Sequence, residues 1–210
     1  MSSDIKATVT TQRRYNRNAP LYDLMEGLVE ISRYSKWRSL LWSKVEGSRI
    51  LEVGVGTGKN FPYYPKDADI TAIDLSDKML ARAIDKASKQ NVRVHLQQMD
   101  VEKLEFEDNI FDTIVATFVF CSVPNPIRGL VELERVCKSG GKVVLLDHVL
   151  SANRILGGLM NVANPLVVRM MGANINRRTV NNVSNSGLVV EKVTDLQAGI
   201  FKLIEARKNR

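Results

Sequence analysis

A short apolar run that contains Glu52 ends in three alternating glycines, Gly54, Gly56 and Gly58, and a later apolar run ends in Asp74. We interpret both runs as neighbouring buried strands, with the glycines forming the turn at the carboxyl end of the first. At such a turn a ligand approaches the main chain more closely than a Cβ would permit. An acid at the end of the adjacent strand accepts hydrogen bonds from ribose hydroxyls. The spacing therefore predicts a nucleoside-binding site.

The glycine spacing also indicates which nucleoside binds. Dinucleotide-binding proteins use G-x-G-x-x-G, whereas Lys59 occupies the place of the last glycine here. A dinucleotide brings a pyrophosphate, which favours a helix N-terminus; S-adenosylmethionine (SAM) brings a sulfonium cation, which suits the acid Glu52. The pattern resembles E/D-x-G-x-G-x-G, the first motif of class I SAM-dependent methyltransferases. A glycine-rich turn in another doubly wound α/β protein is the alternative, and the features downstream disfavour it.

Strands and helices must alternate to position these residues. Apolar runs predict five strands, at 49–53, 69–74, 92–97, 111–117 and 141–147. Helices are expected between them at 76–89 and 126–137. This alternation indicates a parallel sheet with helices on both faces. Two final strands, 188–194 and 199–206, are close enough to pair antiparallel. The predicted fold class is α/β, a Rossmann-like seven-stranded sheet whose last strand is antiparallel.

The ends of the chain extend this domain. Residues 1–12 are polar and are expected to fray. Residues 21–46 carry apolar residues at helical spacing and are expected to form two amphipathic helices. We predict that residues 1–46 form a helical cap or lid over a SAM-binding domain of residues 47–210. Within that domain, residues from about 148 to 186 are expected to form an insertion on the acceptor side.

The composition fits one globular domain of 210 residues, with 44% hydrophobic and 25% charged residues. The N-terminus lacks the apolar core of a secretory signal, and uncharged stretches fall short of the roughly 20 apolar residues of a membrane span. Two cysteines, Cys121 and Cys137, form neither a disulfide framework nor a metal cluster. We expect a cytoplasmic protein that binds no metal.

Basic charge gathers in the insertion. The net charge of +7 favours an anionic partner. Residues 148–186 contain four arginines among many apolar residues, with no acid and no aromatic residue. This mixture favours a lipid surface or an apolar substrate over a nucleic-acid groove, which usually offers aromatic stacking. We expect peripheral association with an anionic membrane surface. A helix is expected near 176–186.

Three stretches resemble particular branches of the methyltransferase family. Residues 14–23 resemble the Y-x-x-x-A-x-x-Y-D opening of quinone-biosynthesis C-methyltransferases and bacterial phospholipid N-methyltransferases. Residues 51–64 are similar to the phospholipid N-methyltransferase-like and membrane-associated thiol methyltransferase branches. Residues 135–141 resemble R-V-L-K-P-G-G, with Ser139 in place of proline. The resemblance implies the strand order 3-2-1-4-5-7-6, SAM as cofactor and S-adenosylhomocysteine (SAH) as product.

The resemblance also implies where the cofactor binds. Asp74 would hold the ribose, Asp100 would accept from the adenine amino group, and Val101 would pack on the ring. Tyr15 is a candidate for a cation–π contact with the sulfonium, although it can equally be an ordinary aromatic residue of an amphipathic helix. The full set expected around the cofactor is Tyr15, Glu52, Gly54, Gly56, Thr57, Gly58, Asn60, Asp74, Leu75, Ser76, Met79, Asp100, Val101, Thr117 and Phe118.

The acceptor side offers fewer signals, because an activated methyl group needs a base only if the acceptor must lose a proton. His148, after the fifth strand, is a candidate catalytic proton acceptor; the alternative is a histidine hydrogen-bonded to a neighbouring carbonyl. Tyr22 is the second catalytic candidate. Cys121 could line the acceptor site or simply pack in the core. The residues expected to bind the acceptor are Tyr22, Cys121, His148 and Arg177.

These observations favour a SAM-dependent methyltransferase that acts on a lipid or apolar acceptor at a membrane surface. A phosphatidylethanolamine head-group amine is the first choice. A quinone C-methyltransferase or a small-molecule thiol methyltransferase is the alternative enzyme. A basic nucleic-acid-binding protein that retains a SAM site, or a SAM-binding regulatory subunit, represents another class. Neither an N-P-P-aromatic motif nor a Pro-Cys pair follows the fourth strand, which disfavours DNA methylation.

Overall fold

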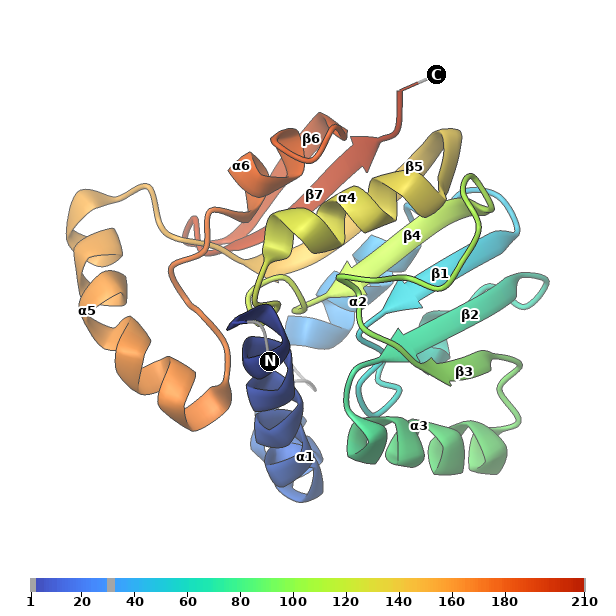
Figure 1. The fold of residues 1–210 in the computed structure, drawn as a ribbon, viewed down its shortest axis with the longest axis horizontal. Helices are drawn as coiled ribbons and strands as arrows, with labels where there is room; N and C mark the ends of the chain where they lie inside the picture. Colours follow the sequence, from blue (N-terminus) through green and yellow to red (C-terminus); the bar gives the residue numbers. More distant parts are fainter. Residues whose placement is uncertain (1–2, 30–32, 210) are drawn as a thin grey trace.

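A seven-stranded sheet forms the centre of the molecule (Figure 1). The computed structural model describes residues 3–29 and 33–209, without the side chains of residues 3, 4, 20–29 and 171. The sheet order is β3-β2-β1-β4-β5-β7-β6, and only β7 runs antiparallel to its neighbours within this sheet. The strands are β1 (Arg49–Val53), β2 (Asp69–Asp74), β3 (His95–Gln98), β4 (Phe111–Thr117), β5 (Cys137–His148), β6 (Val189–Gln197) and β7 (Phe201–Arg207). The predicted fold class and the strand order that the resemblance implied are both confirmed.

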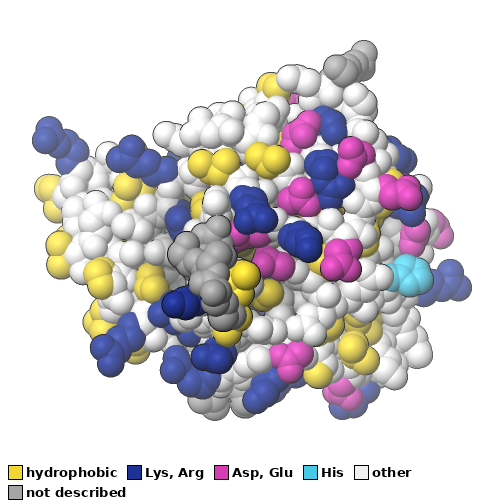
Figure 2. Space-filling model, viewed as in Figure 1, with side chains coloured by type: hydrophobic (Ala, Val, Ile, Leu, Met, Phe, Trp, Pro, Cys, Tyr) yellow, Lys and Arg dark blue, Asp and Glu magenta, His cyan; other side chains and the backbone are white. Residues whose placement is uncertain are grey.

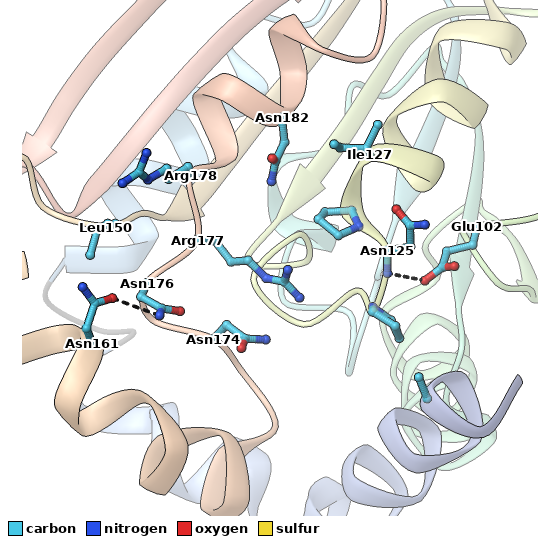
Figure 3. A pocket seen from close by; sticks show the side chains of 13 residues that line it. Glu102, Asn125, Ile127, Leu150, Asn161, Asn174, Asn176, Arg177, Arg178 and Asn182 are labelled. Carbon is cyan, nitrogen blue, oxygen red and sulfur yellow. Dashed lines mark hydrogen bonds between the residues drawn. The ribbon is translucent and has the colours of Figure 1, made fainter. Parts of the chain in front are cut away.

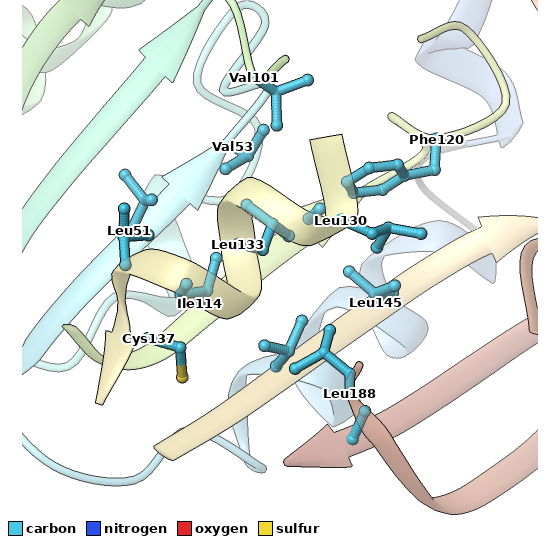
Figure 4. Packing of buried hydrophobic residues seen from close by; sticks show 14 of the residues in the cluster. Leu51, Val53, Val101, Ile114, Phe120, Leu130, Leu133, Cys137, Leu145 and Leu188 are labelled. Carbon is cyan, nitrogen blue, oxygen red and sulfur yellow. The ribbon is translucent and has the colours of Figure 1, made fainter. Parts of the chain in front are cut away.

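Helices cover both faces of the sheet because the strand side chains alternate between two apolar layers. On one face, Leu133 of α4 (Pro126–Val136) packs in the same cluster as Leu145 of β5 (Figure 4). On the other face, Leu41 of α2 (Ser35–Trp42) packs against the side chains of the intervening strand positions. Each face therefore excludes water from the central strands, which places the polar groups of the site at the strand ends.

α3 (Asp77–Gln90) starts immediately after β2. Ser76 is its N-cap, with the hydroxyl oxygen accepting a hydrogen bond from the Met79 amide at 3.1 Å. Asn91, in the left-handed conformation at φ 52°, ends the helix. The short connection directs the first turn of α3 toward the carboxyl edge of the sheet.

α1 (Ser3–Val29) is one long helix, so the expectation that residues 1–12 fray was wrong for the residues that the structure describes. The two helices expected over 21–46 correspond to the end of α1 and to α2. The proposed division between a cap and a SAM-binding domain at residue 46 stays a prediction.

Polar contacts explain why the sequence pattern missed the start of α1. The Gln12 side-chain amide donates to the Leu75 carbonyl at 3.1 Å, and that of Asn16 donates to the Asp77 carboxylate at 2.6 Å. The Ser76 hydroxyl donates to the Asn16 side-chain oxygen at 2.5 Å. These bonds hold α1 against the first turn of α3. Hydrophobic periodicity cannot predict such contacts, because they join polar side chains to segments far away in the sequence.

β5 begins directly where α4 ends, which corrects the prediction of a helix to residue 137 and a strand from 141. Cys137 already pairs with Phe111 of β4. Gly140, at φ 71°, lies inside the strand, close to the shift in register between Phe111 and Thr113. A β-bulge of this kind accommodates extra residues without ending the pairing. Gly140 and Gly141 therefore lie within β5 and not in a loop.

Residues 148–186, which we predicted to be an insertion, contain two helices, α5 (Arg154–Met171) and α6 (Thr179–Ser184). α6 lies within the helix expected near 176–186. The sequence analysis did not predict α5, because two adjacent glycines and a proline interrupt it and because most of its large apolar residues are exposed, Met160 being buried. Its boundaries nevertheless carry ordinary signals, with Asn153 as N-cap and Gly172 at φ 84° as C-cap. In Figure 1 α5 stands apart from the sheet.

Asp147, near the end of β5, ties the insertion to the sheet. It is fully buried, and one carboxylate oxygen accepts a hydrogen bond from the Thr179 hydroxyl at 2.9 Å. The other oxygen has no partner among the described residues. Burial raises the pKa of Asp147 to about 6, which the bond from Thr179 only partly opposes.

Because that pKa lies above the usual value of 3.8, protonated Asp147 favours the folded state, and this contribution is present below pH 4 and lost as the pH rises to 6. The shift corresponds to at most about 3 kcal/mol. We expect Asp147→Asn to flatten the fall in unfolding free energy between pH 4 and 7, as measured by urea denaturation. Asp67→Asn, at an exposed carboxylate, is the control and should keep the wild-type pH profile. Equal slopes for wild type and Asp147→Asn would contradict the assignment.

Candidate active site

The carboxyl ends of β1, β2, β3 and β4 surround a cavity that residues of α1 help to close. We call it the central cavity. Its lining consists of Thr11, Tyr15, Val53, Gly54, Gly56, Ile73, Asp74, Leu75, Met79, Met99, Asp100, Val101, Thr117, Phe118, Val119, Ser122, Val123 and Pro124. Open parallel sheets bind ligands at this edge, because the loops on the two faces separate there.

Asp74 presents a carboxylate that the main chain holds in place. One oxygen accepts a hydrogen bond from the Gly56 amide and the other from the Ser76 amide, each at 2.8 Å. Burial raises the pKa of Asp74, and the two amide bonds lower it. Each oxygen retains a further lone pair. A fixed carboxylate with two available lone pairs suits two adjacent hydroxyl groups, such as those of a ribose.

The three glycines of the turn meet different demands, although each has a positive φ, of 69°, 57° and 76° along the chain. A Cβ on Gly54 would lie 2.4 Å from a methyl carbon of Val119, and one on Gly58 would lie 2.3 Å from the ring of Phe61. A Cβ on Gly56 would meet nothing within 4 Å, and Gly56 lines the central cavity. Packing requires the first and third glycines, whereas the second leaves space for a ligand.

Glu52 is enclosed behind the turn and does not line the central cavity. Its carboxylate accepts hydrogen bonds from the Asn60 amide at 2.6 Å and from the Tyr64 hydroxyl. Asn60 also donates to the Thr117 hydroxyl and accepts from Arg38, both at 3.0 Å. Burial raises the pKa of Glu52, while these hydrogen bonds and the charge of Arg38 lower it. This network fixes Thr117, which does line the cavity.

The far end of the central cavity combines apolar walls with one acid. Met79, Met99 and Val101 supply the apolar surface, and Asp100 lies beside them. One Asp100 oxygen accepts from the Glu102 amide at 2.9 Å, so a short turn orients the carboxylate. Apolar side chains next to a hydrogen-bond acceptor suit a flat heterocycle that carries an amino group, as the resemblance implied for adenine.

The near end of the central cavity is built on an unusual backbone. Phe118 has a φ of 57°, and its amide donates to the Leu146 carbonyl at 2.7 Å. A left-handed conformation costs a bulky residue about 1–3 kcal/mol, so the surrounding contacts must hold it. The Arg38 guanidinium lies 5.8 Å from the centre of the Phe118 ring. Facing this region, the hydroxyls of Tyr15 and Ser122 form a hydrogen bond.

The residues predicted to bind the acceptor lie in different places. Cys121 is buried, its thiol donates to a backbone carbonyl at 3.4 Å, and burial raises its pKa well above the usual value. His148 packs edge-on against Phe201, with ring centres 5.0 Å apart, and burial lowers its pKa. Neither residue lines the central cavity. Arg177 lines two adjoining cavities. The side chain of Tyr22 lies outside the described residues.

Comparison with known proteins identifies the family. Residues 51–145 match the sequence model of a family described as Methyltransferase domain. A phosphatidylethanolamine N-methyltransferase from Cereibacter sphaeroides is 41% identical over 138 residues, which cover 65% of this chain and 66% of the relative. The ubiquinone/menaquinone biosynthesis C-methyltransferase UbiE from Geobacter sp. (strain M21) is 33% identical over 138 residues, covering 61% and 59%. The chain belongs to the class I SAM-dependent methyltransferases.

Solved structures share the fold of this methyltransferase. A SAM-dependent methyltransferase from Thermotoga maritima, described as a possible histamine N-methyltransferase, superposes with a TM-score of 0.72 at 19% identity, covering 94% of this chain and 99% of that one. A geranyl diphosphate methyltransferase in complex with SAM gives a TM-score of 0.72 at 14% identity, covering 83% and 85%. In sequence, the chain spans 66% and 59% of the two relatives named above.

The central cavity fits SAM, because it joins a carboxylate for the ribose, an open glycine and an apolar end with an acid. Among the residues predicted around the cofactor, those that line it are Tyr15, Gly54, Gly56, Asp74, Leu75, Met79, Asp100, Val101, Thr117 and Phe118. Those that lie behind the lining are Glu52, Thr57, Gly58, Asn60 and Ser76. The lining residues that sequence reasoning missed are Thr11, Val53, Ile73, Met99, Val119, Ser122, Val123 and Pro124. Thr11 carried no signal, because its segment was expected to fray.

Alanine at two of the glycines should separate binding from stability. We expect Gly56→Ala to lower SAH affinity at least tenfold, because its Cβ enters the ligand space, while unfolding free energy falls by only the conformational cost of about 1–2 kcal/mol. Gly58→Ala carries the same conformational cost plus an overlap with Phe61, worth a further 1–3 kcal/mol or so. Calorimetric titration with SAH and urea denaturation measure the two effects. Normal SAH binding by Gly56→Ala would refute the assignment of the open glycine.

Proposed function

We propose that this chain transfers a methyl group from SAM to the head-group amine of phosphatidylethanolamine, leaving SAH. The observation that carries the proposal is the 41% identity to a phosphatidylethanolamine N-methyltransferase, against 33% for a quinone C-methyltransferase over the same alignment length. The higher identity supports an amine nitrogen as the methyl acceptor.

The side chains at the near end of the central cavity suit this acceptor. When bound, SAM supplies a methyl group that its sulfonium already activates. The chain must then hold the acceptor nitrogen in line with that methyl, about 3–3.5 Å away. The hydroxyls of Tyr15 and Ser122 line the cavity and can accept hydrogen bonds from a head-group ammonium. Tyr22 and His148 stay candidates for the group that receives the departing proton.

Quinone C-methylation is the second candidate. Besides the relatives named for that reaction, an aromatic cluster next to the central cavity supports it. Tyr34, Trp37, Phe118 and Phe201 lie with ring centres 5.0–6.1 Å apart, and Phe118 lines the cavity. Such rings can stack on a flat apolar acceptor.

An acceptor screen separates these candidates. We expect purified protein with radiolabelled SAM to methylate phosphatidylethanolamine in mixed micelles, with a product of increased mass identified by mass spectrometry. A demethylquinone and an alkyl thiol, tested under the same conditions, should give at most about one per cent of that rate. Faster methylation of the quinone would overturn the proposed acceptor in favour of the second candidate.

Docking of α5 on an anionic membrane would bring the enzyme to this substrate. Five apolar side chains at helical spacing form one exposed face of α5, called here the α5 stripe. They are Ile155 (79% exposed), Leu159 (63%), Val162 (82%), Leu166 (62%) and Met170 (63%). Figure 2 shows hydrophobic and basic side chains in this part of the molecule, and residues 148–186 contain no acid. Apolar insertion and basic charge together suit a peripheral contact with anionic lipid.

No helix among the described residues is both long enough and apolar enough to cross a bilayer. Binding to lipid vesicles tests the proposed docking of α5. We expect Val162→Asp to reduce binding to vesicles containing phosphatidylglycerol about tenfold or more, because the variant loses an apolar contact and gains a repelled charge. Val131→Asp, on an exposed face of α4, makes the same change elsewhere and should bind normally. Sedimentation with vesicles measures both; equal losses in the two variants would argue against the α5 stripe.

A further inference from the structure

A second, strongly polar cavity of about 780 Å³ adjoins the proposed catalytic site (Figure 3). It lies between the start of α4, the inner side of α5, the segment before α6, and α6 itself. Five asparagines, two arginines and one glutamate supply most of its polar lining: Asn125, Asn161, Asn174, Asn176, Asn182, Arg177, Arg178 and Glu102. Holding a methyl donor does not require this group of side chains. We call it the asparagine cavity.

Arg177 is the central cation of the asparagine cavity. One of its terminal nitrogens donates to the Val123 carbonyl at 2.9 Å, while its Nε is buried without a hydrogen-bond partner among the described residues. In Figure 3 its guanidinium points toward Asn125 and Glu102. Burial lowers the pKa of Arg177, since the charge is partly removed from water. A half-buried guanidinium that lines a cavity is a strong candidate for binding an anion.

The charges around Arg177 favour an anion. Glu102 is the acid of the cavity lining, and one of its oxygens already accepts from the Asn125 amide at 2.8 Å. Exposed Arg178 adds a second cation to the lining. Lys6 and Arg14 line a smaller cavity of about 320 Å³ that shares Arg177 with this one. Positive charge therefore exceeds negative charge along the whole opening.

The asparagine cavity adjoins the proposed position of the acceptor. Pro124 lines the asparagine cavity, the central cavity and the smaller cavity. Ser122 and Thr11 line both the central and the smaller cavity. Ser122 also bonds to Tyr15, where an acceptor amine would bind. Arg177 and the proposed methyl-transfer position thus lie in adjoining cavities that share lining residues.

We propose that the asparagine cavity binds the phosphate group of the acceptor, with Arg177 as the main ligand and Arg178 and side-chain amides as further donors. The proposal rests on the proposed function only for the source of that phosphate, a phospholipid head group. A phosphodiester one short spacer from an amine would occupy both sites together. The two cavities would then recognise the two charged ends of one head group, while the acyl chains remain near α5.

The test compares three water-soluble probes on SAH-loaded protein by calorimetric titration. Glycerophosphoethanolamine carries both phosphodiester and amine, inorganic phosphate carries only the anion, and ethanolamine carries only the amine. We expect Arg177→Gln to weaken glycerophosphoethanolamine about tenfold to a hundredfold, with ethanolamine and SAH unchanged. Arg177→Lys should recover part of the loss, because it restores the charge without the planar fork. Arg93→Gln removes an exposed arginine beside β3 and serves as the matched control.

Unchanged glycerophosphoethanolamine binding in Arg177→Gln would overturn the proposal, and so would an equal loss in Arg93→Gln. If inorganic phosphate bound with the same dependence on Arg177 and glycerophosphoethanolamine did not bind, the phosphate would not come from a phospholipid head group. Arg177-dependent binding of glycerophosphoethanolamine without methylation of phosphatidylethanolamine would leave the anion site standing and remove the proposed acceptor. A variant that no longer binds SAH would be misfolded. In that case Arg178→Gln provides the second test, with a smaller loss of glycerophosphoethanolamine affinity expected than for Arg177→Gln.

Discussion

Two main-chain hydrogen bonds to one carboxylate, that of Asp74, join the parts of the molecule on which the site depends. The Gly56 amide belongs to the turn after β1, and the Ser76 amide belongs to the start of α3. The Asp74 carboxylate therefore links the loop after β1 to the loop after β2. Ser76 in turn bonds to Asn16 of α1. Fold and cofactor site therefore share a single charged group, whose ionised form the two amides stabilise against the cost of burial.

A second polar assembly supports this one from behind. Glu52, the acid of the glycine motif, is satisfied by Asn60 and Tyr64, and Asn60 extends the network to Thr117 and Arg38. A buried carboxylate without such partners would cost several kcal/mol. The motif acid thus shapes the cavity wall through its neighbours. The Glu52 carboxylate does not line the central cavity, so it acts on a ligand across the residues of the cavity wall.

The sequence predicted those features that local rules control. Apolar runs located the strands, and the glycine spacing with Asp74 located the central cavity, because each depends on residues close together in the chain. The prediction failed where contacts between residues far apart in the sequence determine the structure. The start of α1 depends on Gln12 and Asn16 meeting α3, and α5 exposes the apolar residues that usually indicate a core. The asparagine cavity gathers residues from positions 7 to 182, and no local pattern marks such a group.

The way in which α1 is attached has a consequence for turnover. Thr11 and Tyr15 line the central cavity, so a displacement of this helix would open a way out for the spent cofactor. Its described hydrogen bonds at the start of α3 join two pairs of polar side chains and one side chain to the main-chain carbonyl of Leu75. Each is worth a net 0.5–1.5 kcal/mol or so, and water replaces them as they break. Because water can replace these bonds, this part of the helix could open to admit and release nucleosides repeatedly at a modest energetic cost.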